Sequence, residues 1–159
     1  MNITAATLYP LTTLATVLAV IVYFALGIVV GKARATYGVA APAMTGHVEF
    51  EKRSRVQINT LEQIVMFLPM LWLAVAVLGD LWTALAGLVW SVGRIIYARA
   101  YYADPAKRSL GFTLTLLPTL VLLIATVWGA VRGLMLQRRF DRRAAAPPDD
   151  QFLTPQPAS

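Results

Sequence analysis

Four long apolar stretches constrain the fold more than any other feature of this sequence. They lie at about residues 8–30, 55–78, 81–102 and 110–134, and aliphatic and aromatic side chains dominate each of them. Because a helix rises about 1.5 Å per residue, about 20 residues cross the roughly 30 Å hydrocarbon core of a bilayer. The sequence therefore predicts an all-α membrane protein, a four-transmembrane-helix bundle that occupies residues 1–136.

The composition supports a membrane protein and excludes several chemistries. The chain is 58% hydrophobic and 14% charged with a mean hydropathy of +0.63, whereas soluble domains are about 45–50% apolar and about 25% charged. With no cysteine and a single histidine, His47, it offers neither a disulfide framework nor a multi-histidine metal site, so we expect no metal. The net charge of +6 is typical of basic membrane loops, and we expect no nucleic-acid partner.

The connections between the stretches predict the topology. Gly79-Asp80 is too short for anything but an antiparallel hairpin, while the two longer connections fall together on the other side of the bundle, near residues 35–54 and 103–109. Those connections and their flanks hold most of the basic residues of the membrane domain, so the positive-inside rule places them in the cytoplasm. We expect a multi-pass protein of a bacterial inner membrane. The end of the chain, residues 137–159, is basic and then rich in Pro and Ala, which predicts disorder.

The second stretch carries polar side chains on one face. At about 100° per residue, Arg55, Asn59 and Glu62 fall within an arc of about 60°. A charge near the bilayer centre costs roughly 2.5–3.5 kcal/mol, so such residues normally face a partner or a watery cavity. We therefore expect a polar site inside the membrane domain.

The third stretch supplies the other half of that site. Arg94, Tyr97 and Tyr101 have the same spacing, and Arg108 continues the phase of that face. The hairpin brings the start of the second stretch beside the end of the third. Arg94 lies deeper than the others, with Glu62 as its nearest candidate counter-charge.

This group of side chains indicates an anionic ligand. Guanidinium forks bind carboxylates, Glu62 accepts an ammonium group, and Asn59 and Gln57 suit amides. A small peptide with two carboxylates and one amine fits that inventory. The alternative is a self-satisfied polar network that holds the helices together.

Two segments carry a resemblance to a known family. The first is residues 49–62, which contain Glu49-Phe-Glu51 and Arg55-Val-Gln-Ile-Asn-Thr-Leu-Glu62. The second is residues 94–112, which run from Arg94 through Asp104-Pro105 to Phe112. Both segments resemble the MAPEG family of membrane-associated proteins in eicosanoid and glutathione metabolism. The resemblance implies a homotrimer that binds glutathione between neighbouring protomers. Gln63 stands where leukotriene-forming members have a tyrosine, which argues against a specialised eicosanoid enzyme, and the Asp104-Pro105 turn is more similar to the bacterial and microsomal transferase branch.

The resemblance also implies roles for individual residues. Arg108 matches the arginine that stabilises the glutathione thiolate and is the expected catalytic residue, and Arg34 is the nearest basic residue to one used at the end of the first helix. With Arg94 added from the helix spacing, the expected binding residues are Arg55, Gln57, Asn59, Glu62, Tyr97, Tyr101, Arg94 and Arg34.

The resemblance implies a glutathione transferase of detoxification, with glutathione-dependent peroxidase chemistry as a second expected activity. Glutathione is the expected co-substrate, and a lipophilic electrophile or lipid hydroperoxide is the expected partner from the membrane lipid. Two alternatives stay open. One is a non-catalytic lipid-binding scaffold of the same family, and the other is a small transporter subunit.

Overall fold

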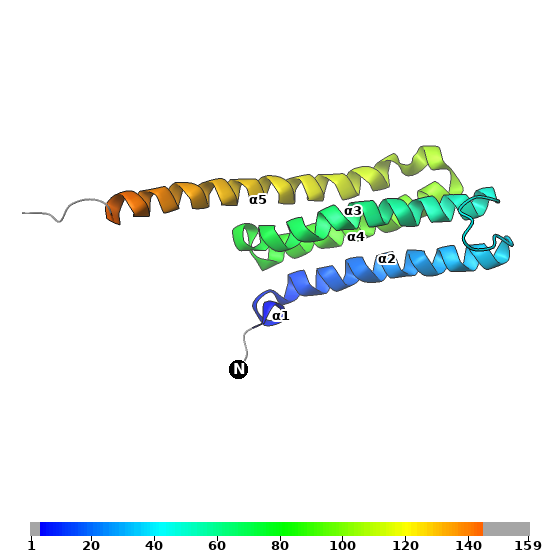
Figure 1. The fold of residues 1–159 in the computed structure, drawn as a ribbon, viewed down its shortest axis with the longest axis horizontal. Helices are drawn as coiled ribbons and strands as arrows, with labels where there is room; N and C mark the ends of the chain where they lie inside the picture. The colour runs from blue at the N-terminus through cyan, green and yellow to red at the C-terminus, as the bar shows by residue number, and fades with distance from the viewer. Residues whose placement is uncertain (1–3, 145–159) are drawn as a thin grey trace, which may run out of the picture.

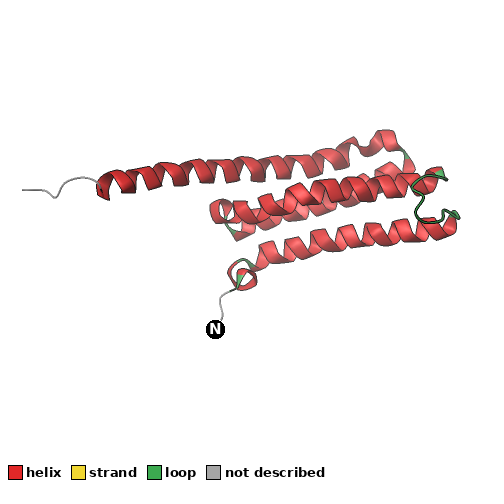
Figure 2. Cartoon of the chain, in the orientation of Figure 1, coloured by secondary structure: helices red, strands yellow, loops and turns green. Residues whose placement is uncertain are grey.

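A computed structural model describes residues 4–144 as four long helices packed side by side, with no strand in that range (Figures 1 and 2). A short helix α1 (Ala5–Leu8) precedes α2 (Pro10–Thr36), α3 (Val48–Leu78) and α4 (Asp80–Ala103). A 3₁₀ turn η1 (Pro105–Arg108) then leads into α5 (Ser109–Ala144). The predicted all-α four-helix bundle is confirmed.

All four long helices have the length and composition of membrane spans. Their outward surface is apolar: Phe24, Val65, Trp82, Ile124 and Trp128 are each more than 60% exposed. Exposed apolar area on this scale is rare in soluble monomers, and a bilayer covers it. The chain is an integral, multi-pass membrane protein.

Helix α3 begins at Val48, earlier than the expected boundary at Arg55. The reason is a helix cap: the Nδ1 atom of His47 accepts the backbone N–H of Glu49 at 3.2 Å, and Glu49 and Glu51 lie in the positively polarised first turn. His47, the single histidine of the sequence, is therefore the residue that caps the start of this helix. The polar residues before the apolar stretch are therefore helical.

Helix α5 continues past the expected end of the membrane domain at residue 136. It extends beyond the ends of the other helices in Figure 1 and includes residues 137–144, which the sequence placed in a disordered tail. This segment is Gln-Arg-Arg-Phe-Asp-Arg-Arg-Ala and contains good helix formers without Pro or Gly. The rest of the predicted tail, residues 145–159, lies outside the described residues.

Helix α4, like α3, packs against all three other long helices of the bundle. Its Trp90 stacks on Phe67 of α3 with ring centroids 4.6 Å apart, and both side chains are fully buried among Ala19, Leu71 and Leu122. Offset aromatic stacking of this kind adds to the free energy of burying the rings. This core fixes the depth of α3 relative to α4, and with it the depth of the polar residues farther along both helices.

Near the C-terminal end of α4, the backbones of α4 and α5 approach so closely that no side chain fits between them. A Cβ atom built at Gly111 would overlap the backbone N and Cα atoms of Tyr97 and lie 2.7 Å from its Cβ atom. Glycine is therefore required here for the close approach of two helices. The contact sets the position of Tyr97.

Asp80 at the start of α4 caps a different helix. Its carboxylate accepts the backbone N–H groups of Leu11 at 3.0 Å and Thr12 at 2.7 Å, both in the first turn of α2. The first N–H groups of a helix have no partner within the helix, and the helix dipole favours a negative charge there. Asp80 therefore links α2 to the hairpin between α3 and α4.

Replacing Asp80 with alanine should lower the free energy of unfolding by about 1–2 kcal/mol, the usual effect of removing a helix cap. Thermal unfolding of the detergent-purified protein, followed by tryptophan fluorescence, measures the change. Asp141→Ala is the matched control, because Asp141 is exposed near the end of α5, and it should change stability by less than about 0.5 kcal/mol. Equal effects of the two substitutions would contradict the capping role.

Candidate functional site

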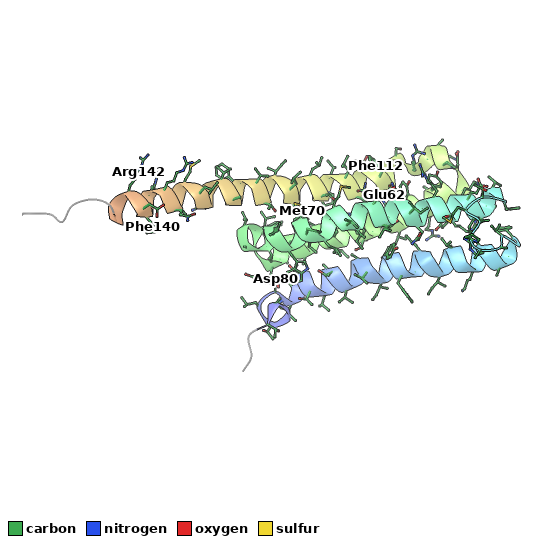
Figure 3. The ribbon with its side chains drawn as sticks, in the orientation of Figure 1. Glu62, Met70, Asp80, Phe112, Phe140 and Arg142 are labelled. Carbon is green, nitrogen blue, oxygen red and sulfur yellow. The ribbon has the colours of Figure 1, made fainter. Side chains whose placement is uncertain are left out.

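A cavity of about 270 Å³ opens near one end of the bundle, where α3, α4, η1 and α5 meet. Glu62 on α3 and Phe112 on α5, both labelled in Figure 3, belong to its walls. We call it the polar cavity. Its lining residues are Arg55, Asn59, Glu62, Tyr97, Tyr101, Arg108 and Phe112.

Regular helix geometry brings these residues together. Arg55, Asn59 and Glu62 occupy one face of α3, and Tyr97 and Tyr101 occupy one face of α4, with ring centroids 5.7 Å apart. Asp104 caps η1 by accepting the backbone N–H of Ala106 at 2.9 Å, and this sharp turn returns Arg108 to the same side. The guanidinium carbon of Arg108 lies 5.8 Å from the centre of the Tyr101 ring.

The polar cavity carries surplus positive charge. Arg55 and Arg108 line it together with Glu62, the one carboxylate among its lining residues. Among the described side chains, residues 4–142, the ion pairs are Lys52 with Glu49, Arg53 with Glu49 and Lys107 with Asp104, so neither arginine of the cavity has a carboxylate partner there. Two free guanidinium groups and one carboxylate make a site for an anion that also carries a positive group.

Two further hollows adjoin the polar cavity. One, of about 480 Å³, shares Arg55 and Tyr101 with it and extends toward Met44 and Thr45 in the connection between α2 and α3. The other, which we call the outer hollow, measures about 490 Å³ and shares Arg108 and Phe112; its remaining walls are Pro105, Ala106 and Ser109. Arg108 therefore lies where a polar cavity meets a mostly apolar surface.

Arg94 is close to the polar cavity but does not line it. It is fully buried, and its Nη2 atom donates to Oδ1 of Asn59 at 3.0 Å and to Oγ1 of Thr60 at 2.7 Å. Its guanidinium carbon lies 4.4 Å from the centre of the Tyr97 ring. The expected counter-charge is wrong: Asn59, and not Glu62, is the partner of Arg94, because Asn59 stands between them.

Two other expected binding residues point elsewhere in this chain. Gln57 donates from Nε2 to the hydroxyl of Tyr23 on α2 at 2.8 Å. Arg34 donates from Nη1 to the carbonyl oxygens of Val39, Ala40 and Ala43 at 2.8–3.2 Å and stabilises the connection between α2 and α3. Neither lines the polar cavity, and their contact with a ligand stays a prediction.

Phe112 is the lining residue that the sequence argument did not single out. It lies four residues after Arg108, which places both on one side of the turn that starts α5. The four-residue spacing from Arg108 could have predicted Phe112 as a cavity residue. The surrounding stretch is apolar, however, so one more apolar side chain gave no reason to select it. The self-satisfied network considered above does not describe Arg55 and Arg108, whose guanidinium groups face a cavity without a carboxylate partner among the described side chains.

The fold and the cavity define a class: a four-helix integral membrane protein with a cationic, tyrosine-walled site near one end of its bundle. The chain belongs to the MAPEG family, whose model matches residues 12–128. It is 45% identical over 126 residues to an uncharacterized protein of Synechocystis sp., covering 79% of this chain and 89% of that relative.

Two relatives with named activities are also similar. The chain is 39% identical over 109 residues to microsomal glutathione S-transferase 2 of Homo sapiens, covering 69% of this chain and 71% of the relative. It is 36% identical over 86 residues to leukotriene C4 synthase of Bos taurus, covering 54% of this chain and 56% of the relative. The first name refers to glutathione transfer and the second to the synthesis of leukotriene C4.

Proposed function

We propose that this chain is a membrane-bound glutathione transferase that binds glutathione in the polar cavity and activates its thiolate with Arg108. The observation that carries the proposal is the pair of guanidinium groups of Arg55 and Arg108, which have no carboxylate partner in the described part of the chain, beside the carboxylate of Glu62. The names of the microsomal glutathione S-transferase relatives support the same activity.

The charges of glutathione match those of the cavity. The tripeptide has two carboxylates, one ammonium group and two amides. Arg55 can take a carboxylate through two parallel hydrogen bonds, and Glu62 can take the ammonium group. Asn59 and the hydroxyls of Tyr97 and Tyr101 are left for the amides and the second carboxylate.

Arg108 is then the group nearest to the sulfur. A free thiol has a pKa of about 8.5, and a fixed cation next to it favours the nucleophilic thiolate at neutral pH. The thiol proton passes to water, the sulfur forms a carbon–sulfur bond with the electrophile, and the leaving group departs with its electron pair. Since Arg108 also borders the outer hollow, the sulfur would meet a lipophilic electrophile that arrives from the membrane.

The proposal extends to the arrangement of the protein in the cell. We expect lipid hydroperoxides as alternative acceptors, a homotrimer as the working unit, and a bacterial inner membrane as the location. The site end of the bundle, with both longer connections, would face the cytoplasm, where glutathione is available. A lipid-binding scaffold would not need an unpaired arginine at the edge of a polar cavity.

Ultraviolet difference spectroscopy of the purified protein tests the proposal directly. The sequence contains no cysteine, so a thiolate band that appears on adding glutathione can come only from the ligand. S-methylglutathione is the matched control, because it has the same charges but cannot ionise at sulfur. The same preparation should conjugate glutathione to 1-chloro-2,4-dinitrobenzene; a scaffold would give neither band nor product, and a transporter would move solute in proteoliposomes without forming conjugate.

A further inference from the structure

The buried guanidinium of Arg94 has no carboxylate partner in the described part of the chain. Its Nη2 atom is bonded to Asn59 and Thr60, while its Nε and Nη1 atoms are buried without a hydrogen-bond partner. A buried cation in this state lowers stability rather than raising it. A role limited to holding the helices together therefore does not explain why the guanidinium group of Arg94 is buried.

Arg94 imposes one orientation on the amide of Asn59. A guanidinium group carries only donors, so the carbonyl oxygen of the amide must face Arg94 and its NH₂ group must face away. The Nδ2 atom accordingly donates to Oε2 of Glu62 at 3.4 Å on the cavity side. The same guanidinium lies against the ring of Tyr97, another wall of the cavity.

We propose that Arg94 is a positioning residue that fixes Asn59 as a hydrogen-bond donor toward Glu62 and the ligand. Arg94 does not line the cavity itself. Without it, the amide can rotate and present its oxygen beside the Glu62 carboxylate, where two acceptors repel each other. The effect on ligand binding rests on the proposed function, whereas the amide orientation does not.

Nuclear magnetic resonance on asparagine-labelled protein tests the orientation without any ligand. The sequence has two asparagines, Asn2 and Asn59, so ¹⁵N-asparagine labelling gives two side-chain amides, and the Asn59→Ala variant identifies the signals of Asn59. Arg94→Lys should speed hydrogen exchange of the Asn59 side-chain amide at least about 10-fold, because a point charge cannot hold both neighbours as the planar fork does. Thr60→Val removes the other partner of Arg94 and should leave that exchange unchanged. Unchanged exchange in Arg94→Lys would overturn the proposal.

Glutathione affinity, measured by titration calorimetry, tests the consequence for the site. Arg94→Lys should raise the Kd about 10-fold to 100-fold, the effect of a lost hydrogen bond to a charged group. In an Asn59→Ala background the same substitution should change the Kd by less than about twofold, because its target is absent. An equal loss in both backgrounds would mean that Arg94 acts on general stability, and this result would refute the positioning role.

The Asn59→Asp variant separates two roles of residue 59: accepting a hydrogen bond from Arg94 and donating one to Glu62. The aspartate keeps an oxygen for Arg94 and supplies its missing counter-charge, so the melting temperature should not fall. It replaces the donor beside Glu62 with an acceptor, so the Kd for glutathione should rise at least about 10-fold. Unchanged affinity would show that the donor is not needed. If the unaltered protein binds no glutathione, the proposed function fails, and the exchange measurement still decides the role of Arg94.

Discussion

Replacing Arg108 with alanine is expected to lower kcat for glutathione conjugation by about 100-fold to 1,000-fold at neutral pH while glutathione remains bound. Removing one group that stabilises a developing or fixed negative charge in an active site typically has this effect. Arg55 and Glu62 hold the ends of the tripeptide in our proposal, so affinity should change much less than rate. Steady-state kinetics and the thiolate band, measured on the same preparation, report both quantities.

The pH dependence should identify the cause. With Arg108 present, we expect the thiol pKa to lie below its ordinary value of about 8.5, so the thiolate should already be formed at neutral pH and the rate should be nearly constant above it. In Arg108→Ala, the rate should rise as pH increases through about 8.5 and the deficit should shrink. A deficit that is the same at every pH would point to lost positioning instead of lost thiolate stabilisation.

Lys107→Ala is the matched control for this prediction. Lys107 precedes Arg108 on η1, is largely exposed, and lies 3.8 Å from Asp104 rather than at the cavity. The Lys107→Ala substitution removes a positive charge from the same turn as Arg108→Ala does. It should change the rate by less than about twofold, since exposed ion pairs contribute little. A comparable loss in Lys107→Ala would contradict a specific role for Arg108.

The sequence predicted the helices and much of the cavity because both depend on local periodicity. Apolar length defined the four spans, and steps of three and four placed Arg55, Asn59 and Glu62 on one face of α3. The short Gly79-Asp80 connection then required the start of α3 to lie beside the end of α4. Whether those residues bind glutathione stays a prediction.

What the sequence could not predict depends on contacts between distant parts of the chain. Helix periodicity puts Gln57 on the opposite side of α3 from the cavity, where it bonds to Tyr23, and only the family resemblance placed it at the ligand. The carbonyl groups that Arg34 binds come from a loop whose path has no periodic signal. Which side chain of α3 contacts Arg94 depends on the position of α3 along the axis of α4. A shift of less than one helical turn would change the partner, and side-chain packing sets this position.

Substitution of Gly111 by alanine is the second large effect we expect: a loss of about 3 kcal/mol or more in the free energy of unfolding. The added methyl group would overlap the backbone of Tyr97, and backbone atoms of two packed helices cannot move aside as a flexible side chain can. Overpacking a well-packed contact typically costs about 1–3 kcal/mol, and a clash with backbone belongs at the top of that range. Thermal unfolding in detergent, or in lipid nanodiscs, measures the loss.

Gly133→Ala is the control for Gly111→Ala, because a Cβ atom at residue 133 meets nothing within 4 Å. There alanine should be neutral or stabilise α5 by up to about 1 kcal/mol through its higher helix propensity. Gly111→Ala should also weaken the thiolate band in protein that remains folded, because α4 and α5 can separate only by moving Tyr97 away from Arg108. Stability equal to that of Gly133→Ala would mean that the two helices are not in close contact at Gly111. A loss of stability with an intact thiolate band would instead uncouple the helix crossing from the site.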